Sequence, residues 1–249
     1  MALPESGRSA ELFARATDPV QYDGSDLDWA AEGAADAPFA TFVRERLEPA
    51  LGSLRDRSVL DIGCGTGHLA LLFEGLAARR MVGLEPSARH ARLAKRLHPR
   101  LLVVRGALQR APLRGGFNVA VAVLSFEHQP DLEAAYRAVA ALLAPAGRFL
   151  LIAGDPLFHR TPRWGLGLEV VEQEDGSALV ATTYPVGPVH DVIRPPAHYQ
   201  HAARAAGFVT VRREPVVPDD ALIARDARWA DFAGRPVAWL IEASAPDRR

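Results

Sequence analysis

Three alternating glycines follow an acidic residue at the end of an apolar run, an arrangement that could bind a small organic ligand. The run from Val59 to Ile62 leads directly into GCGTG at positions 63–67. Glycines let the backbone turn tightly and approach a ligand closely, and the Asp61 carboxylate can accept hydrogen bonds from an ammonium or backbone donor. A dinucleotide-binding turn would have its third glycine at position 68, where this chain has His68. The spacing favours a ligand without a pyrophosphate.

A second acidic residue, Glu85, stands at the distance that a ribose-binding site requires. The stretch from His68 to Arg79 has helical periodicity, and the apolar run from Met81 to Leu84 predicts a buried strand that ends in Glu85. An acid at the carboxyl end of the second strand can accept both hydroxyls of a ribose. S-adenosylmethionine, which has a ribose, an ammonium group and no pyrophosphate, fits this pattern. The alternative is a tight glycine turn that binds nothing.

The elements that must position these residues alternate between strand and helix, as in a doubly wound parallel sheet. We expect an α/β fold with a Rossmann-like, seven-stranded sheet, mostly parallel with the last strand antiparallel, in a single domain over residues 1–249. The predicted strands are Ser58 to Ile62, Arg80 to Glu85, Leu101 to Arg105, Phe117 to Leu124, Arg148 to Ala153, Gly207 to Val211 and Pro236 to Ala243. The predicted helices are Pro38 to Leu51, His68 to Arg79, Ser87 to Leu97 and Asp131 to Leu143.

Two stretches fall outside this alternation and predict a cap over the site. One is the N-terminal segment, residues 1–37, with aromatic residues among acids between Glu11 and Glu32. The other is an insertion after the fifth strand, residues 154–196, in which Asp175-Gly176 predicts a hairpin turn. Because ligands bind outside the carboxyl ends of the strands in such sheets, loops at this edge cover them. The alternative is that both stretches are surface segments with no role in ligand binding.

Four segments resemble motifs of the class I S-adenosylmethionine-dependent methyltransferases. The glycine turn resembles their first motif, LLAPAGR at 142–148 resembles "LLKPGGR", and LSFEH at 124–128 resembles "VLEH". RPPAHY at 194–199 with AGF at 206–208 is similar to "RPLSDY...AGF" in bacterial members that methylate small molecules. The resemblance covers most of the chain from Pro38 onward. It implies methyl transfer from S-adenosylmethionine, with S-adenosylhomocysteine as the other product.

The resemblance also implies which residues hold the cofactor. Asp61 and the glycines would border the methionine part, Glu85 the ribose and Leu108 the adenine. The chain departs from the family at Ala107, where relatives often have an acid that binds the adenine amino group; Gln109 can bond the edge of the ring instead. The expected cofactor-binding residues are Asp61, Gly63, Cys64, Gly65, Gly67, His68, Glu85, Pro86, Ala107, Leu108 and Leu124.

His128 is the expected catalytic residue. Methyl transfer mainly requires that the acceptor be held in line with an activated methyl group, and a base helps only when the acceptor must lose a proton. His128 follows the fourth predicted strand at its carboxyl end, beside the expected methyl group, and could serve as base or orient the acceptor. No metal site is expected. The expected substrate-contacting residues are Tyr22, Trp29, His128, Phe158, His159, Trp164 and Arg194.

Composition limits the partners. The chain has 29 Lys and Arg against 30 Asp and Glu, so no overall field attracts nucleic acid or an anionic membrane. A single cysteine, Cys64, excludes an intramolecular disulfide and fits a reducing compartment, and no signal peptide is visible. We therefore expect a cytoplasmic enzyme that methylates oxygen or nitrogen of a small molecule, in natural-product or secondary metabolism, with a homodimer left open.

Three alternatives remain open. A methyltransferase for a macromolecule is disfavoured by the balanced charge. A protein that binds S-adenosylmethionine without methylating anything is kept open by Ala107. A nicotinamide oxidoreductase is disfavoured by His68.

Overall fold

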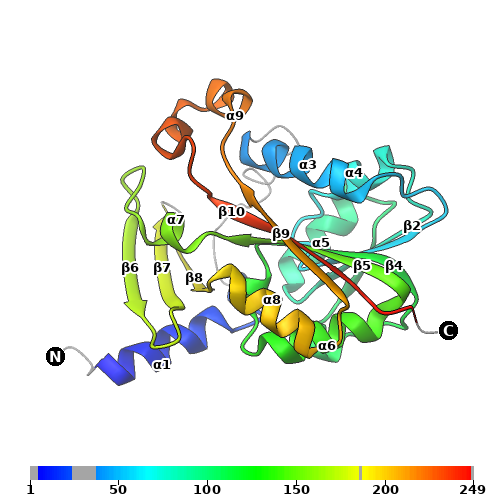
Figure 1. Cartoon of the computed structure of the whole chain (residues 1–249), viewed down its shortest axis with the longest axis horizontal. Helices are drawn as coiled ribbons and strands as arrows, with labels where there is room; N and C mark the ends of the chain where they lie inside the picture. Colours follow the sequence, from blue (N-terminus) through cyan, green and yellow to red (C-terminus); the bar gives the residue numbers. More distant parts are fainter. Residues whose placement is uncertain (1–4, 24–37, 185–186, 248–249) are drawn as a thin grey trace.

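A seven-stranded, mostly parallel sheet forms the centre of the protein, as the sequence predicts. The structure is a computed structural model that describes residues 5–23, 38–184 and 187–247. The strands of this sheet are β1 (Ser58–Ile62), β2 (Arg80–Glu85), β3 (Leu102–Arg105), β4 (Phe117–Val123), β5 (Leu143–Gly154), β9 (Thr210–Val216) and β10 (Ala238–Ser244). Their order is β3-β2-β1-β4-β5-β10-β9, with β10 antiparallel to both neighbours (Figure 1). The order reverses between β1 and β4, which places a ligand-binding crevice at their carboxyl ends.

Helices cover both faces of the sheet. In Figure 1, α3 (Pro38–Leu51) and α4 (Ala70–Gly75) lie above the sheet, while α6 (Leu132–Leu142) and α8 (Pro196–Ala205) lie below it. A further helix, α5 (Ala88–Leu97), packs on the same face as α3 and α4. Burial on both faces explains why the strands are nearly continuous apolar runs in the sequence.

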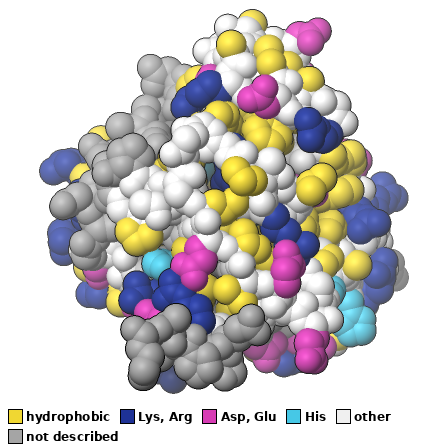
Figure 2. Space-filling view, turned by 90° about the vertical axis from the view of Figure 1, so that its left-hand side faces the viewer, with side chains coloured by type: hydrophobic (Ala, Val, Ile, Leu, Met, Phe, Trp, Pro, Cys, Tyr) yellow, Lys and Arg dark blue, Asp and Glu magenta, His cyan; other side chains and the backbone are white. Residues whose placement is uncertain are grey.

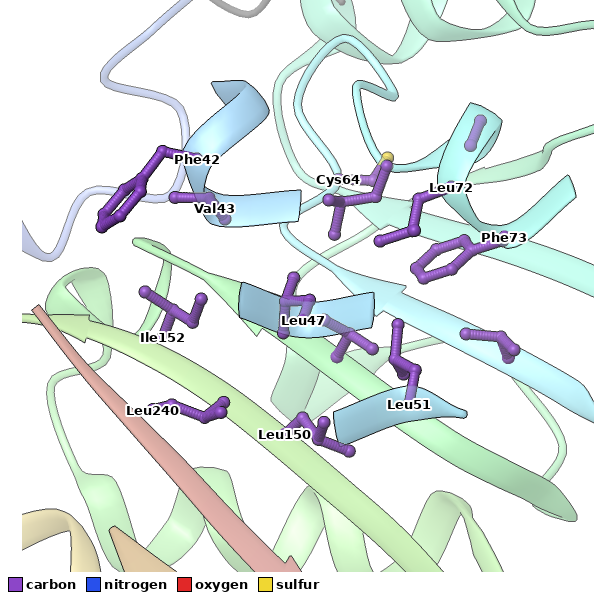
Figure 3. Packing of buried hydrophobic residues seen from close by; sticks show 14 of the residues in the cluster. Phe42, Val43, Leu47, Leu51, Cys64, Leu72, Phe73, Leu150, Ile152 and Leu240 are labelled. Carbon is purple, nitrogen blue, oxygen red and sulfur yellow. The ribbon is translucent and has the colours of Figure 1, made fainter. Parts of the chain in front are cut away.

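The core on the α3 face is built from aliphatic side chains of the helix and the strands. Leu47 and Leu51 of α3 lie against Leu150 and Ile152 of β5 (Figure 3). Each of these four residues is at most 2% exposed. Full burial of one such side chain contributes about 1.5 to 3 kcal/mol, so this face fixes the strands whose carboxyl ends form the site.

The helix after the glycine turn is shorter than predicted. The sequence predicts a helix from His68 to Arg79, whereas α4 spans only Ala70–Gly75. Residues 65–69 form turns, in which the Ala70 N–H donates to the Gly67 carbonyl oxygen three residues earlier, and Ala77, with a φ of 60°, lies just past the C-terminal end of the helix.

β3, β4 and β10 differ from their predicted bounds by one or two residues, and two strands differ by more. β5 begins at Leu143 rather than Arg148, because Leu143 pairs with Phe117 across an irregularity in β4. β9 runs over Thr210–Val216 rather than Gly207 to Val211, because it pairs with β10 along its whole length.

The predicted cap is a second, three-stranded sheet with a helix on it. The sheet has the order β6 (Gly167–Glu172), β7 (Ala178–Tyr184), β8 (Gly187–Ile193), and all its pairs are antiparallel. The hairpin between β6 and β7 lies where Asp175-Gly176 predicts it. On the left of Figure 1, α1 (Glu5–Ala16) crosses this sheet.

Apolar and charged contacts hold α1 on the cap sheet. Leu12 and Ala16 pack against buried side chains of β7 and β8. Arg8 donates hydrogen bonds to Glu11 and Glu169, the latter on β6. On the described part of this side of the molecule, hydrophobic side chains lie among charged side chains of both signs (Figure 2). That the cap and the main sheet form one domain stays a prediction.

Short helices complete the described structure. They are η1 (Leu108–Arg110), η2 (Phe126–His128), α7 (Pro156–Arg160), α9 (Asp220–Arg225) and η3 (Ala227–Phe232). None of the helices in the described ranges is both long and apolar enough to span a bilayer.

Candidate active site

The turn after β1 has a left-handed backbone at all three glycines. The φ angles of Gly63, Gly65 and Gly67 are 71°, 54° and 87°, which glycine adopts most readily. A Cβ atom on Gly63 would lie 2.5 Å from the Cβ of Ser125, and one on Gly67 would lie 2.8 Å from the ring of His98. A Cβ atom on Gly65 would meet no described atom within 4 Å. Packing therefore requires Gly63 and Gly67, whereas Gly65 faces open space in which a ligand can approach the backbone.

Glu85 joins this turn to the end of β2. Its Oε2 accepts a hydrogen bond from the Gly65 N–H, and its Oε1 accepts one from the Ser87 N–H, both at 2.8 Å. The residue is 4% exposed. Burial raises the pKa of its carboxyl group, while the two N–H donors oppose that rise. Because each carboxylate oxygen has more than one acceptor position, Glu85 can still accept hydroxyl groups of a ribose.

Asp61 presents a carboxyl group with an unused oxygen beside Glu85. It is 2% exposed, and its Oδ2 has no hydrogen-bond partner among the described residues. Burial, and then the charge of Glu85, raises the pKa of Asp61 to about 8. A buried carboxyl group without a partner is unfavourable on its own, and a cationic donor would satisfy it.

The segment after α1 crosses the ribose side of this site. Ser87, the N-cap of α5, accepts a hydrogen bond from the His90 N–H and donates from its Oγ to Asp23 at 2.6 Å. The ring of Tyr22 stacks on His90 with 5.7 Å between centroids. The chain at positions 22–23 therefore covers the end of β2.

Cys64 in the glycine turn points into the protein interior, whereas His68, which follows the turn, is half-buried. The Sγ of Cys64 packs against Gly83, so that a Cβ atom added to Gly83 would lie only 2.6 Å from it. Figure 3 shows Cys64 in the core with Leu72. Contact between Cys64 and a ligand is therefore limited to its backbone. His68 has a pKa lowered to about 4 by burial and by nearby positive charge, so it is a neutral ring at physiological pH.

The other residues expected to bind the cofactor lie at the ends of β2, β3 and β4. Pro86 and Ala107 are half-buried, and Leu108 is buried in the core of the α6 face. Leu124 is half-buried at the end of β4 with a φ of 47°. Gln109 donates to Gln129 at 2.6 Å; since an amide has a second N–H and an accepting oxygen, this contact still allows a bond to the edge of the adenine. Contact of these residues with the cofactor stays a prediction.

His128 lies at the carboxyl end of β4, where the sequence predicts it, and the N-terminal segment reaches it. Its Nε2 is 2.9 Å from the hydroxyl of Tyr22, so the structure brings two predicted site residues together. Its Nδ1 is 3.1 Å from the carbonyl oxygen of Ala16 and 3.2 Å from the amide nitrogen of Gln21. The carboxylate of Asp191 on β8 is 3.8 Å from the same Nδ1. Burial lowers the pKa of His128.

A buried carboxyl group adjoins His128. Glu127 is 2% exposed; its Oε1 accepts from the Gly154 N–H at 2.7 Å, and its Oε2 has no partner among the described residues. The imidazole of His159 packs directly on the backbone of Gly154. A Cβ atom added to Gly154 would lie 2.3 Å from the Nε2 of His159. Burial, and then Arg163, lowers the pKa of His159 to about 3, so this ring cannot carry a charge at neutral pH.

Three residues expected to contact substrate make structural contacts. Arg194 donates to the Gln129 carbonyl oxygen at 2.7 Å and so ties the end of β8 to the segment after η2. Phe158 and Trp164 pack with Trp229 and Phe232 in an aromatic cluster. Their contact with substrate stays a prediction, and Trp29 lies outside the described residues.

The sequence analysis did not identify Asp191, Asp23 or Gln21 as site residues. Asp191 follows His190 in β8, and only the register of the cap sheet shows which of the two faces His128. Asp23 and Gln21 flank Tyr22, so their signal was adjacency to a predicted site residue.

Comparison with known proteins places this geometry in a family. The family model described as a methyltransferase domain matches residues 34–211, which is more than half of the chain. The chain belongs to this family. Its sheet and glycine turn are those of the class I S-adenosylmethionine-dependent methyltransferases.

Curated relatives match over shorter lengths. The tRNA U34 carboxymethyltransferase of Cellvibrio japonicus (strain Ueda107) is 44% identical over 45 residues, 18% of this chain and 14% of that protein. The chain thus spans only a small part of the first relatives it matches. The ubiquinone biosynthesis O-methyltransferase of Xanthomonas axonopodis pv. citri (strain 306) is 32% identical over 161 residues, 62% of each chain.

Solved structures share the fold over nearly their whole length. An S-adenosylmethionine-dependent methyltransferase from Mesorhizobium loti has a TM-score of 0.63 at 22% identity, covering 86% of this chain and 99% of that one. The glycopeptide N-methyltransferase MtfA, in complex with S-adenosylhomocysteine, has a TM-score of 0.62 at 18% identity, covering 83% and 90%. At these identities the likeness establishes the fold.

Proposed function

We propose that the protein transfers a methyl group from S-adenosylmethionine to an oxygen or nitrogen of a small molecule. The observation that carries the proposal is the convergence of Asp61, Gly65 and Glu85 at the ends of β1 and β2, with His128 at the end of neighbouring β4. Natural-product or secondary metabolism is the proposed setting.

The residues present fit S-adenosylmethionine. The unpartnered Oδ2 of Asp61 suits the ammonium group, Glu85 suits the ribose, and Gly65 leaves room for a ligand against the backbone. When bound, this cofactor supplies a methyl group on a sulfonium centre, which is already activated for transfer. The protein then needs to hold the acceptor in line and exclude water, and orientation alone can account for ~7 to 11 kcal/mol of a barrier.

A small acceptor is supported by the cap. The segment that contains Tyr22 and Asp23 contacts both the acceptor side, at His128, and the ribose side, at Ser87. Strand β8 closes the site from another direction through Asp191. Such enclosure suits a metabolite better than a polymer, and the mixed charges on the described cap surface offer no extended basic face for RNA (Figure 2). The O-methyltransferase relative matches a far longer stretch than the tRNA-modifying relatives.

Binding of the cofactor without methyl transfer is the competing proposal, and it is supported by Ala107 at the adenine side. Calorimetric titration with S-adenosylhomocysteine tests the cofactor site. Release of S-adenosylhomocysteine from S-adenosylmethionine is then followed with a panel of phenols, sugars and amines, with bulk tRNA as comparator. Turnover of a panel member faster than tRNA supports the proposal. Tight binding with no turnover of any acceptor would favour the competing one, and faster turnover of tRNA would contradict a small acceptor.

A further inference from the structure

Both ring nitrogens of His128 have partners in the protein, and these favour one tautomer. The Ala16 carbonyl oxygen, 3.1 Å from Nδ1, can only accept, and the Asp191 carboxylate faces the same nitrogen, so a proton on Nδ1 is favoured over the alternative in which the Gln21 amide, 3.2 Å away, donates to it. Nε2 then carries the lone pair and accepts from the Tyr22 hydroxyl at 2.9 Å. The nitrogen that could act as a base is therefore covered by the hydroxyl of Tyr22.

Asp191 supports the imidazole on the opposite side. Its carboxylate is 3.8 Å from Nδ1, and the two side chains are only 13% and 15% exposed. A negative charge at this distance stabilises the ring when it becomes positively charged. Burial raises the pKa of Asp191 to about 7, with Arg163 opposing the rise, so the carboxylate is available from neutral pH upward.

Tyr22 lies between the cofactor side and the acceptor side. The pKa of its hydroxyl is raised well above its usual value by burial and then by the carboxylates of Asp191, Glu127 and Glu85. Asp191 faces the ring of His128, and Glu127 precedes it in the sequence. Glu85 accepts a hydrogen bond from the glycine turn. Stacking on His90 and edge contact with His128 fix the ring.

We propose that Tyr22 is a catalytic residue whose hydroxyl receives the acceptor's proton while its own proton passes to Nε2 of His128. The inference rests on the proposed function. The O–H or N–H bond of the acceptor would break and leave its electron pair on the acceptor. With bound cofactor, the acceptor would take the methyl group as the methyl–sulfur bond breaks and its electron pair stays on sulfur. Tyr22 gains one proton and gives one up, so it ends neutral. His128 ends as an imidazolium that Asp191 stabilises, and Asp191 is thus a positioning residue.

The groups around His128 determine how it titrates. Glu127, next in sequence, favours the charged ring; Arg194, from the end of β8, and burial both disfavour it. Asp191 faces Nδ1 and Tyr22 faces Nε2. The Asp191 carboxylate can favour the charged ring only at neutral and alkaline pH, because its own pKa is raised to about 7.

Nuclear magnetic resonance of the full chain labelled with ¹⁵N-histidine tests this arrangement without acceptor or cofactor. We expect the Nδ1–H tautomer in the wild type and a downfield shift of the Nε2 resonance in Tyr22→Phe, which keeps the ring but removes the hydroxyl. In turnover of any acceptor found by the screen, Asp191→Asn should lower kcat more at pH 8, where the Asp191 carboxylate is ionised, than at pH 6, where it is protonated. Tyr136→Phe is the control, because it removes a buried hydroxyl that has no described hydrogen-bond partner, and it should leave His128 unchanged.

The opposite tautomer, in which Gln21 donates to Nδ1 and Nε2 carries the proton, would overturn the proposal, as would an unchanged Nε2 resonance in Tyr22→Phe. For any acceptor found by the screen, Tyr22→Phe should lower kcat ~10- to 10³-fold and leave the affinity for S-adenosylhomocysteine unchanged. An unchanged kcat in a correctly folded Tyr22→Phe protein would also overturn it. These readouts are independent of the cofactor titration, so failure here is distinguishable from failure of the proposed function.

Discussion

Binding of S-adenosylhomocysteine should release a proton from Asp61. The pKa of this carboxyl group is raised to about 8 by burial and by Glu85, so at pH 7 about 90% of it is protonated. An ammonium group against Asp61 favours the carboxylate. Binding should therefore release about 0.9 proton at pH 7 and about 0.5 at pH 8, and below pH 8 the affinity should increase by up to about tenfold per pH unit.

Calorimetry in two buffers with different ionisation enthalpies measures this release, because the observed binding enthalpy changes in proportion to the protons transferred. Asp61→Asn should release almost no proton and should bind more weakly by about 1 to 3 kcal/mol at pH 8. Asp131→Asn is the matched control. Asp131 caps α6, and asparagine caps a helix equally well, so this variant should behave as the wild type.

Two results would refute the reasoning about Asp61. Equal proton release by Asp61→Asn and the wild type would assign the proton to another group. Absence of release from the wild type at pH 7 would show that Asp61 is already ionised before binding or does not face the ammonium group.

Three further perturbations test the architecture. Since the folded pKa of Asp61 lies above its ordinary value of 3.8, its contribution to the free energy of unfolding of the unliganded protein should decrease as pH rises from about 4 to 8. In urea titrations, the free energy of unfolding of the wild type should therefore fall relative to that of Asp61→Asn over this range. The same pH dependence in both proteins would contradict this. Gly63→Ala should cost about 1 to 3 kcal/mol because its Cβ overlaps Ser125. In a Ser125→Gly background the same substitution should cost less, because the overlap is gone while the left-handed backbone strain at residue 63 remains; an equal cost in both backgrounds would argue against the overlap. Leu12→Ala should cost ~2 to 4 kcal/mol and increase hydrogen exchange in β7 and β8 but not in β1, and uniform protection would show that α1 does not support the cap.

Features that depend on residues close together in the sequence could be predicted from it. The bounds of β1 and β2 are as predicted because each is an apolar run ended by turn residues. Glu85 meets Gly65 because a strand, a turn and a helix of ordinary length return the chain to the same sheet edge. His128 lies at the carboxyl end of β4 for the same reason.

Features that depend on register and packing could not be predicted in this way. Whether His190 or Asp191 faces His128 depends on the register of β8, and a shift of one residue would exchange them. The aromatic composition of the insertion suggested a substrate pocket, but it does not distinguish such a pocket from the packing of Phe158 and Trp164 against Trp229. The bond from Ser87 to Asp23 joins segments far apart in the sequence, and no local pattern indicates it.

The most direct test of the cofactor site is calorimetric titration of S-adenosylhomocysteine into Gly65→Leu and Gly52→Leu. Both glycines have similar φ angles, 54° and 61°, and a Cβ on either would meet no described atom within 4 Å, so the two substitutions carry similar backbone strain. Gly65→Leu should fill the ligand space and lower affinity at least ~100-fold, about 2.7 kcal/mol, while Gly52→Leu should bind as the wild type does. Equal affinity of the two variants would contradict the placement of the cofactor at the ends of β1 and β2.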